Sequence, residues 1–357
     1  MKNLFLFTAF LFLINCRTSS QTASEYKSRI AILQQNIINY YYDSTTKYYK
    51  EFDVPGPKDK PFSYLWPLCA LIQAANETEK QQLSQISVKA VLNTIQVYAD
   101  NSPPASAYAS YISQIEKSDR FYDDNQWIAI ASMDAYERTN DKQYLAEGEK
   151  IYRYMMTGSD TVSGGGIYWK EGDHSTKNTC SNGPGIILAL QLYKATKKKE
   201  YLDAALAIYQ WTNKYLLAPQ GVYYDNVRLP ARTIDTRTYT YNTGTMLQSN
   251  VLLYEITQQQ QYLTEAKRLA EGAYTHFFRN SRFPGNAWFN AVLLRGYLAL
   301  YKHDANRKYI DAFIADAEAV WTSERDSRNL LGKRNKKELI EQAAMLEIYA
   351  RLLPFVK

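Results

Sequence analysis

The sequence has little histidine, glycine or proline, and each scarcity removes a class of protein. Its three His residues lie far apart and form no HExxH motif, which argues against zinc hydrolase chemistry and leaves few bases for a Ser/His triad. Only 15 Gly and 11 Pro among 357 residues argue against collagen-like, disordered or turn-rich all-β chains. Neither GxGxxG nor GxxxxGK[ST] occurs. We therefore expect no metal ion and no cofactor.

Charge of one sign is also scarce, since the net charge is only +6 and basic and acidic residues are interspersed. The one dense basic stretch, residues 333–337, is typical of a solvated loop, so we expect no nucleic-acid partner. What the chain has in abundance is tyrosine, with 31 residues. The length alone suggests about two domains, although a single large closed fold also reaches it.

The N-terminus has an apolar run of eleven residues, 4–14, after Lys2. Such a run is too short to span a bilayer and is typical of a secretory signal peptide. The tetrapeptide Leu-Ile-Asn-Cys at 13–16 resembles a bacterial lipobox, although Asn15 departs from the small residue usual before the Cys. We predict a signal peptide at 1–15, a lipidated Cys16 as first mature residue, and a short linker at 16–24. An ordinary signal peptide cut nearby is the alternative.

This N-terminus predicts a chain anchored by lipid alone in a bacterial cell envelope. Residues 17–21 contain no acidic run of the kind that marks outward export in lipoproteins resembling those of Bacteroidetes, so the periplasmic side is favoured over the cell surface. Only Cys69 and Cys180 remain after Cys16, too few for a disulfide framework. Both lie in or beside apolar helical stretches and are expected to be buried thiols.

A repeated pattern organises residues 25–357. A polar run is followed by Tyr-Leu or Tyr-Ile and a long amphipathic stretch, and a weaker form occurs at 80–83. Successive tyrosines are 57, 61 and 47 residues apart, a spacing that suits one helical hairpin and a loop. These tyrosines are Tyr144, Tyr201, Tyr262 and Tyr309.

A second kind of helix, apolar over most of its circumference, alternates with the first and is expected to be buried. These helices are predicted at 63–76, 125–138, 182–196, 242–257, 286–303 and 337–353. Six inner and six outer helices in alternation predict an all-α chain folded as one (α/α)6 barrel. The structural alternative is an open α-solenoid. We favour the barrel because solenoid repeats are usually shorter and more uniform.

The long connections all precede the inner helices, so they should gather on one face of the ring. They span residues 102–124, 158–181, 218–241 and 277–288 and are rich in aromatic residues. Long loops on one face of a rigid scaffold are where function is expected.

Two adjacent carboxylates, Asp123 and Asp124, begin the second inner helix. Neighbouring carboxyls facing a cavity repel one another, so one of them should keep its proton to higher pH. One ionised carboxylate and one proton donor are what a glycosidase needs. Alternatively, either residue could simply cap the helix.

The surrounding motif, Phe-Tyr-Asp-Asp-Asn-Gln-Trp at 121–127, resembles the active-site signature of glycoside hydrolase family 76, the endo-α-1,6-mannanases. Other segments agree in order with that family. They are Ser-Tyr-Leu-Trp-Pro at 63–67, Gly-Gly-Ile-Tyr-Trp at 165–169, Lys-Asn-Thr-Cys-Ser-Asn-Gly-Pro at 177–184, Thr-Tyr-Asn-Thr-Gly at 240–244 and the helix at 288–295. The chain departs from the family pattern at Thr243, in place of Gln, and at Phe289-Asn290, in place of Lys-Gly.

The resemblance implies endo-acting hydrolysis of α-1,6-linked mannan with retention of configuration. We expect the chain to be a monomer. If the roles in the family motif apply to the matching positions here, Asp123 is the nucleophile. Asp124 is then the acid that protonates the leaving oxygen and afterwards the base that activates water. Aromatic candidates for stacking on sugar rings are Tyr64, Trp66, Trp127, Tyr168, Trp169, Tyr241 and Trp288. Polar candidates for binding sugar hydroxyls or orienting the acids are Asn125, Gln126, Asn182, Asn242 and Asp225. Core packing, for the aromatic residues, and helix capping, for the Asn residues, are the structural alternatives.

Two other functions stay open at this point. One is transglycosylation or exo-action on an α-mannoside by the same scaffold. The other is a non-catalytic glycan-binding lipoprotein, against which the intact acid pair argues, because a pure binder need not keep both acids. Fold alone cannot decide among them.

Overall fold

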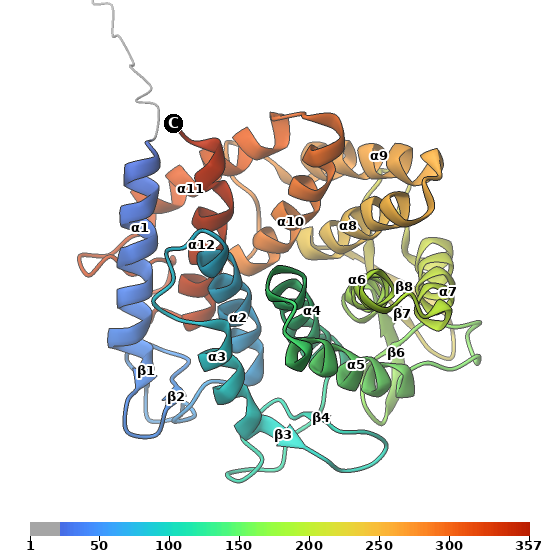
Figure 1. Ribbon diagram of the computed structural model, residues 1–357, viewed down its shortest axis with the longest axis horizontal. Coiled ribbons are helices and arrows are strands. Elements are labelled where there is room, and N and C mark those ends of the chain that lie inside the picture. Colours follow the sequence, from blue (N-terminus) through green and yellow to red (C-terminus); the bar gives the residue numbers. More distant parts are fainter. Residues whose placement is uncertain (1–21) are drawn as a thin grey trace, which may run out of the picture.

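The computed structural model describes residues 22–357, so the predicted signal peptide and Cys16 lie outside the described residues. Six inner helices line the ring of Figure 1: α2 (Leu65–Lys80), α4 (Tyr122–Thr139), α6 (Thr179–Thr196), α8 (Thr240–Thr257), α10 (Ala287–Asp304) and α12 (Leu339–Leu352). Six outer helices surround them: α1 (Ala23–Asn36), α3 (Val88–Ile95), α5 (Lys142–Thr157), α7 (Lys199–Leu216), α9 (Gln260–Phe277) and α11 (Lys308–Ser323). The protein is an (α/α)6 barrel, as predicted.

The ring closes where its last inner helix meets its first. Helix α12 packs against α2, and α1 packs against α12. The backbone N–H of Ala23 donates to the carbonyl of Lys357 at 2.6 Å, and Arg29 pairs with Glu318 of α11. Figure 1 shows the C-terminal end of the chain beside the start of α1.

The inner helices are parallel to one another, because their first turns meet at one end and their last turns at the other. At the first end, Trp66 and Trp127 contact Trp288 from α2, α4 and α10. At the other end, Arg351 of α12 pairs with Glu77 of α2 at 3.0 Å, and Lys194 of α6 pairs with Glu255 of α8 at 3.3 Å. We refer to these ends as the loop face and the turn face of the ring.

The recurrent tyrosine of the outer helices connects one hairpin to the next. Tyr201 is buried and donates to Glu149 of the preceding outer helix at 3.1 Å. Tyr309 is likewise buried and donates to Glu271 at 3.0 Å. These tyrosines are therefore part of the packing between neighbouring hairpins.

Several predicted boundaries differ from the observed ones. Helices α4 and α6 each begin three residues before the predicted start, and α8 begins two residues before it. The predicted starts, Asn125, Asn182 and Asn242, lie inside the first turns of these helices. The helical domain begins at Ala23, two residues before the predicted boundary, because Thr22 caps α1 with its side chain. The weak repeat at 80–83 is a turn, and the first complete outer helix after it begins at Val88 behind the cap Ser87.

The long loops contain strands that the sequence did not predict. Strands β5 (Tyr168–Lys170), β6 (Asp173–Asn178), β7 (Tyr224–Arg228) and β8 (Thr233–Thr238) form one antiparallel sheet, with β6 paired to β7 across two different loops. Two small hairpins complete the loop face: β1 (Tyr42–Asp43) with β2 (Tyr48–Tyr49), and β3 (Ala99–Asp100) with β4 (Ala107–Tyr108).

Cys69 and Cys180 are buried free thiols, as predicted. Within residues 22–357, no helix combines the length and the apolar character needed to cross a bilayer.

Candidate active site

Asp123 and Asp124 occupy the second and third positions of α4, directly after the cap residue Phe121 and the first residue Tyr122. Neither residue caps the helix, so the structural alternative of a simple cap does not hold. Both side chains are half-buried at the loop face. Free N–H groups at a helix start favour a negative charge there, which helps one carboxylate stay ionised in a largely dry environment.

The Asp123 carboxylate is held on one oxygen only. Trp169 donates its indole N–H to Oδ2 of Asp123 at 3.2 Å, whereas Oδ1 is buried without a hydrogen-bond partner among residues 22–357. Burial raises the pKa of Asp123, and the hydrogen bond from Trp169 opposes that rise. One oxygen of Asp123 is therefore oriented and the other is free to react.

The Asp124 carboxyl receives no hydrogen bond from any residue that the structure describes. Its backbone carbonyl accepts from the Cys69 thiol at 3.2 Å. Burial, followed by repulsion from the Asp123 carboxylate, raises the pKa of Asp124 well above that of an ordinary Asp. Repulsion within the pair thus favours a proton on one of the two carboxyls to higher pH than in an ordinary Asp, as their adjacency suggested.

Strand β5 and the glycine-containing turn before it position Trp169 next to Asp123. Phe121, next to the acid pair, forms a β-bridge with Lys170, and its ring packs at a tilt against Trp169 with a ring-centre distance of 5.0 Å. Gly166 has a φ of +81° and lies so close to the Trp211 ring that a Cβ atom there would approach it to 2.6 Å. Only glycine fits this turn, and the packing on Trp211 fixes the direction in which β5 leaves it.

The polar residues in the first turns of the inner helices hold the preceding loops. Asn125 donates to Tyr108 O at 2.9 Å and accepts from Tyr108 N at 2.8 Å. Asn182 makes the same pair of bonds to Ile167 at 2.9 and 2.8 Å. Both side chains are fully buried, so in this structure they fasten loops and do not face a ligand.

The same position is used twice more around the ring. Thr243 accepts from Tyr223 N at 3.1 Å, and Gln342 makes paired bonds to the backbone of Leu331. Gln126, also fully buried, donates to Ser181 O at 2.8 Å and thereby joins α4 to α6. In the sequence, each of these loop-fastening side chains is a polar residue at the fourth position of an inner helix. From the sequence alone, such a residue is not distinguishable from a helix cap.

The aromatic candidates divide into exposed and buried groups. Tyr64 and Trp169 are each 40% exposed, and Trp66 is half-buried, so these three can meet a ligand. The other four are at least nine-tenths buried: Trp127, Tyr168, Tyr241 and Trp288. For these four the burial supports the core-packing alternative.

Two of the buried aromatic residues have identifiable neighbours. Tyr168 donates its hydroxyl to Asp160 at 2.7 Å, and the buried Lys177 pairs with the same Asp160. Tyr241 lies 4.1 Å, between ring centres, from Phe289. Phe289, which sequence reasoning noted only as a departure from a motif, therefore shares an aromatic cluster with Tyr241 and Trp66 on the side of the ring opposite α4.

A group of buried polar atoms near the sheet retains unused hydrogen-bonding capacity. Asn242 has neither its Oδ1 nor its Nδ2 satisfied, and Asn178 and Asn226 each have an unpartnered Oδ1. Asp225 is buried beside them and accepts from Asn226 at 3.1 Å. Burial raises the pKa of Asp225, against the hydrogen bond from Asn226 and the nearby charge of Arg237. Buried polar atoms without partners are unusual in native proteins and suit a ligand with several hydroxyl groups.

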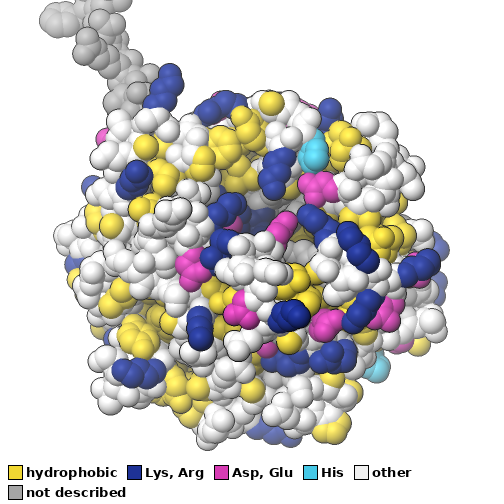
Figure 2. All heavy atoms as spheres, viewed as in Figure 1, with side chains coloured by type: hydrophobic (Ala, Val, Ile, Leu, Met, Phe, Trp, Pro, Cys, Tyr) yellow, Lys and Arg dark blue, Asp and Glu magenta, His cyan; other side chains and the backbone are white. Residues whose placement is uncertain are grey.

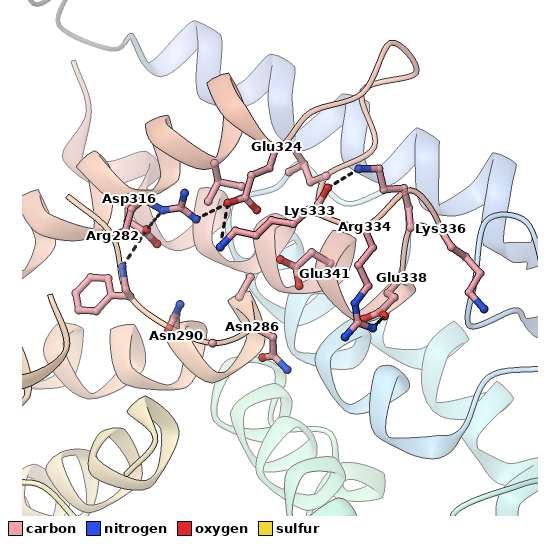
Figure 3. A pocket seen from close by; sticks show the side chains of 17 residues that line it. Arg282, Asn286, Asn290, Asp316, Glu324, Lys333, Arg334, Lys336, Glu338 and Glu341 are labelled. Carbon is pink, nitrogen blue, oxygen red and sulfur yellow. Dashed lines mark hydrogen bonds and ion pairs between the residues drawn. The ribbon is translucent and has the colours of Figure 1, made fainter. Parts of the chain in front are cut away.

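A separate cavity of about 260 Å³ lies between the starts of α10 and α12 and the end of α11 (Figure 3). The predicted solvated loop at 333–337 lines it, and its charges are paired: Lys336 with Asp59, Arg334 with Glu338, and Lys333 with Glu324. The exception among the lining acids is Glu341, because burial, followed by repulsion from Glu324, raises its pKa to about 7.

No cluster of three or more potential metal-ligating side chains occurs within residues 22–357. The arrangement on α4 instead offers two adjacent carboxyls with raised pKa values, with the exposed ring of Trp169 and unpaired buried polar groups in the same region. Such a pair can protonate a leaving oxygen and stabilise or attack an electron-poor carbon.

Comparison with known proteins places this geometry in context. The model of glycosyl hydrolase family 76 matches residues 25–353. Among curated proteins, mannan endo-1,6-alpha-mannosidase DCW1 of Candida glabrata is 31% identical over 151 residues, covering 38% of this chain and 34% of its own length. The protein of the same name from Candida albicans is 28% identical over 187 residues, covering 48% and 41%. The match thus spans well under half the length of these fungal relatives.

Solved structures match over nearly the whole chain. The family 76 mannosidase Bt3792 of Bacteroides thetaiotaomicron is 28% identical, with a TM-score of 0.83 and coverage of 92% of this chain and 98% of its own. An α-1,6-mannanase, GH76A of Salegentibacter sp. HEL1_6, solved as an inactive variant with α-1,6-mannotriose, has a TM-score of 0.79 at 22% identity, covering 92% and 99%. At that lower identity the likeness shows the fold alone.

Proposed function

Because the chain belongs to glycosyl hydrolase family 76 and is thus a glycosidase, we propose that it hydrolyses α-1,6-mannosidic bonds within mannan backbones, as an endo-acting enzyme with retention of configuration. The observation that carries this proposal is the acid pair on α4, in which Oδ1 of Asp123 has no hydrogen-bond partner among residues 22–357 and burial, followed by the Asp123 charge, raises the pKa of Asp124. The relatives named for action on 1,6-linked mannan support the choice of substrate.

The reaction proceeds in two steps. In the first, Oδ1 of Asp123 attacks the anomeric carbon, the glycosidic C–O bond breaks, and the Asp124 proton passes to the leaving oxygen. In the second, Asp124, now ionised, takes a proton from water. The water oxygen attacks the anomeric carbon, and the ester bond to Asp123 breaks. Two inversions leave the product with the configuration of the substrate.

The groups around the acids have separate roles in binding. Trp169 orients Asp123 through Oδ2 and, being exposed, also offers its ring to the sugar. Asp225 and Asn242 supply hydrogen-bonding atoms for the hydroxyls of the mannose residue over Asp123. The exposed Tyr64 and the half-buried Trp66 offer aromatic surface on the loop face for neighbouring mannose residues of the substrate.

The lipobox-like sequence before Cys16 supports a place in the cell envelope, with Cys16 carrying the lipid. The periplasmic side is the one we propose, and one copy of the chain contains the whole site.

The test is product analysis on unbranched α-1,6-mannan. A ladder of manno-oligosaccharides at early times, with the α-anomer formed first in a proton NMR time course, is the expected result. Mannose alone would show exo-action, longer chains would show transglycosylation, and a first-formed β-anomer would exclude the retaining mechanism.

A further inference from the structure

The end of the chain nearest Cys16 emerges on the turn face of the ring, opposite the acid pair. Ala23 is bonded to Lys357, which follows the C-terminal end of α12, and Arg307 of the α10–α11 turn donates to Phe355 O at 3.0 Å. Asp123 and Asp124 are at the opposite ends of the inner helices. A helix of 18 residues, the length of α4, separates the two faces by about 27 Å.

The chain between Cys16 and Thr22 is short. Six residue steps reach at most about 20 Å even when fully extended. A lipid on Cys16 would therefore hold the start of α1 within that distance of a bilayer. The loop face would then lie farther from the bilayer than the turn face does.

The turn face also carries the excess positive charge of the molecule. The short connections and the C-terminal segment contain eleven Lys and Arg but only five Asp and Glu, over residues 80–87, 137–142, 194–200, 255–261, 302–308 and 353–357. The remaining residues of 22–357 contain 29 basic and 31 acidic side chains. Basic residues thus exceed acidic ones in these connecting segments of the turn face and not in the rest of the described chain.

Some of these basic side chains are compensated and others are not. Lys198 pairs with Glu149, and Lys308 with Glu271. Lys197 and Lys302 are exposed and make no ion pair with any residue of 22–357. Figure 2 shows charged side chains of both signs gathered around the middle of the face in view. Exposed basic groups are attracted to anionic lipid within about a Debye length of the surface.

We propose that the turn face is a membrane-docking surface for an anionic lipid bilayer, so that the acid pair of the anchored enzyme lies on the face turned away from the membrane. The proposal rests on the lipid anchor at Cys16 proposed above. Its consequence is that the enzyme acts on polymer arriving from the space beyond the membrane, and not on glycans attached to its own lipid surface.

The test uses the full lipidated chain reconstituted in vesicles of phosphatidylethanolamine and phosphatidylglycerol that contain a lipid-borne fluorescence quencher. Two exposed glutamines provide matched labelling sites: Gln261→Cys on the turn face and Gln114→Cys on the loop face. The native thiols Cys69 and Cys180 are buried, and the unsubstituted chain measures any background labelling. We expect strong quenching at 261 and little at 114.

Equal quenching at both sites, or stronger quenching at 114, would overturn the orientation. A Cys16→Ser chain that floats with vesicles as well as the natural chain does would overturn the tether on which the orientation depends. Mannan cleavage by the same samples in detergent reports the proposed reaction independently, so loss of one proposal is distinguishable from loss of the other.

The contribution of charge is measured with a second matched pair. Lys197→Glu with Lys302→Glu reverses two unpaired charges on the turn face, and Lys58→Glu with Lys117→Glu makes the same change on the loop face. Only the first pair should weaken quenching at 261, and the weakening should disappear in high salt. Equal effects of both pairs would show that the turn face has no lipid affinity of its own.

Discussion

The indole N–H of Trp169 donates to Oδ2 of Asp123 at 3.2 Å, which joins the long loop before α6 to the first turn of α4. The bond orients the proposed nucleophile and favours its ionised form, because it is stronger to a carboxylate than to a carboxylic acid.

Trp169→Phe removes this hydrogen bond but keeps an aromatic ring against Phe121. The pKa of Asp123 should rise, so the acid limb of the pH profile of kcat/KM should move to higher pH. The loss should be about tenfold on that limb, since a hydrogen bond to a charged group is worth about 1.5–3 kcal/mol and this indole is partly exposed. The loss should become smaller as the pH rises.

The control for this variant is Phe121→Leu, which removes the ring that packs against Trp169 and leaves the indole N–H donor of Trp169 in place. It should change KM more than the position of the acid limb. A Trp169→Phe enzyme whose activity is reduced by the same factor at every pH would show that the indole acts on substrate binding and not on Asp123.

Asn182→Ala should destabilise the protein by about 2–4 kcal/mol, because a fully buried amide that fastens the backbone of Ile167 is lost and its partners stay buried. Urea unfolding measures the change. Asn39→Ala, at an exposed site, should stay within about 0.5 kcal/mol of the natural chain. Similar stabilities for the two variants would refute the role of Asn182 as a loop clamp.

Glu341→Gln should stabilise the protein at alkaline pH and have little effect at pH 4. The folded-state pKa of Glu341 is raised to about 7 from an ordinary value near 4.5. The natural chain therefore loses stability as the pH rises from 4.5 through 7, where Glu341 ionises in the unfolded chain first, and a neutral Gln avoids that loss. Thermal melts at pH 4 and pH 8 measure the difference.

Glu338→Gln serves as the comparison in these melts. Glu338 pairs with Arg334, so its loss should bring no gain at pH 8. A gain of equal size in both variants would point to the net charge of the α12 start and not to the environment of Glu341.

The alternation of helices was predictable because burial differs so strongly between the two kinds. Most residues of α6 are buried, whereas only four of the 16 residues of α5 are, and the distribution of apolar residues along the two segments shows this difference. The starts of α4 and α6 were less predictable. Asn is a residue type that is common at helix caps, but Asn125 and Asn182 lie inside the first turn and hydrogen-bond to the backbone of Tyr108 and Ile167.

The sheet at the loop face could not be read from local sequence. Strands β6 and β8 are mostly polar and lack apolar alternation, so the usual signal for a strand is missing. They form because β6 and β7, from loops some 50 residues apart, pair with each other. That pairing also brings Asp225 and Trp169 into the region of the acid pair, which the sequence indicated only through the family resemblance.

The acid pair itself was predictable as a motif, but the different states of its two carboxyls depend on the fold. Only the structure shows that Trp169 reaches Asp123 and that no donor reaches Asp124 within residues 22–357.

The most direct measurement of the central claim is cleavage of unbranched α-1,6-mannan by the natural chain and by the Asp123→Asn and Asp124→Asn variants, with the melting temperature of each recorded. We predict manno-oligosaccharides from the natural chain, none above background from either variant, and melting temperatures close to that of the natural chain. Cleavage that survives either substitution in a folded variant, or a natural chain that leaves the polymer intact, would contradict the assignment of these two carboxyls.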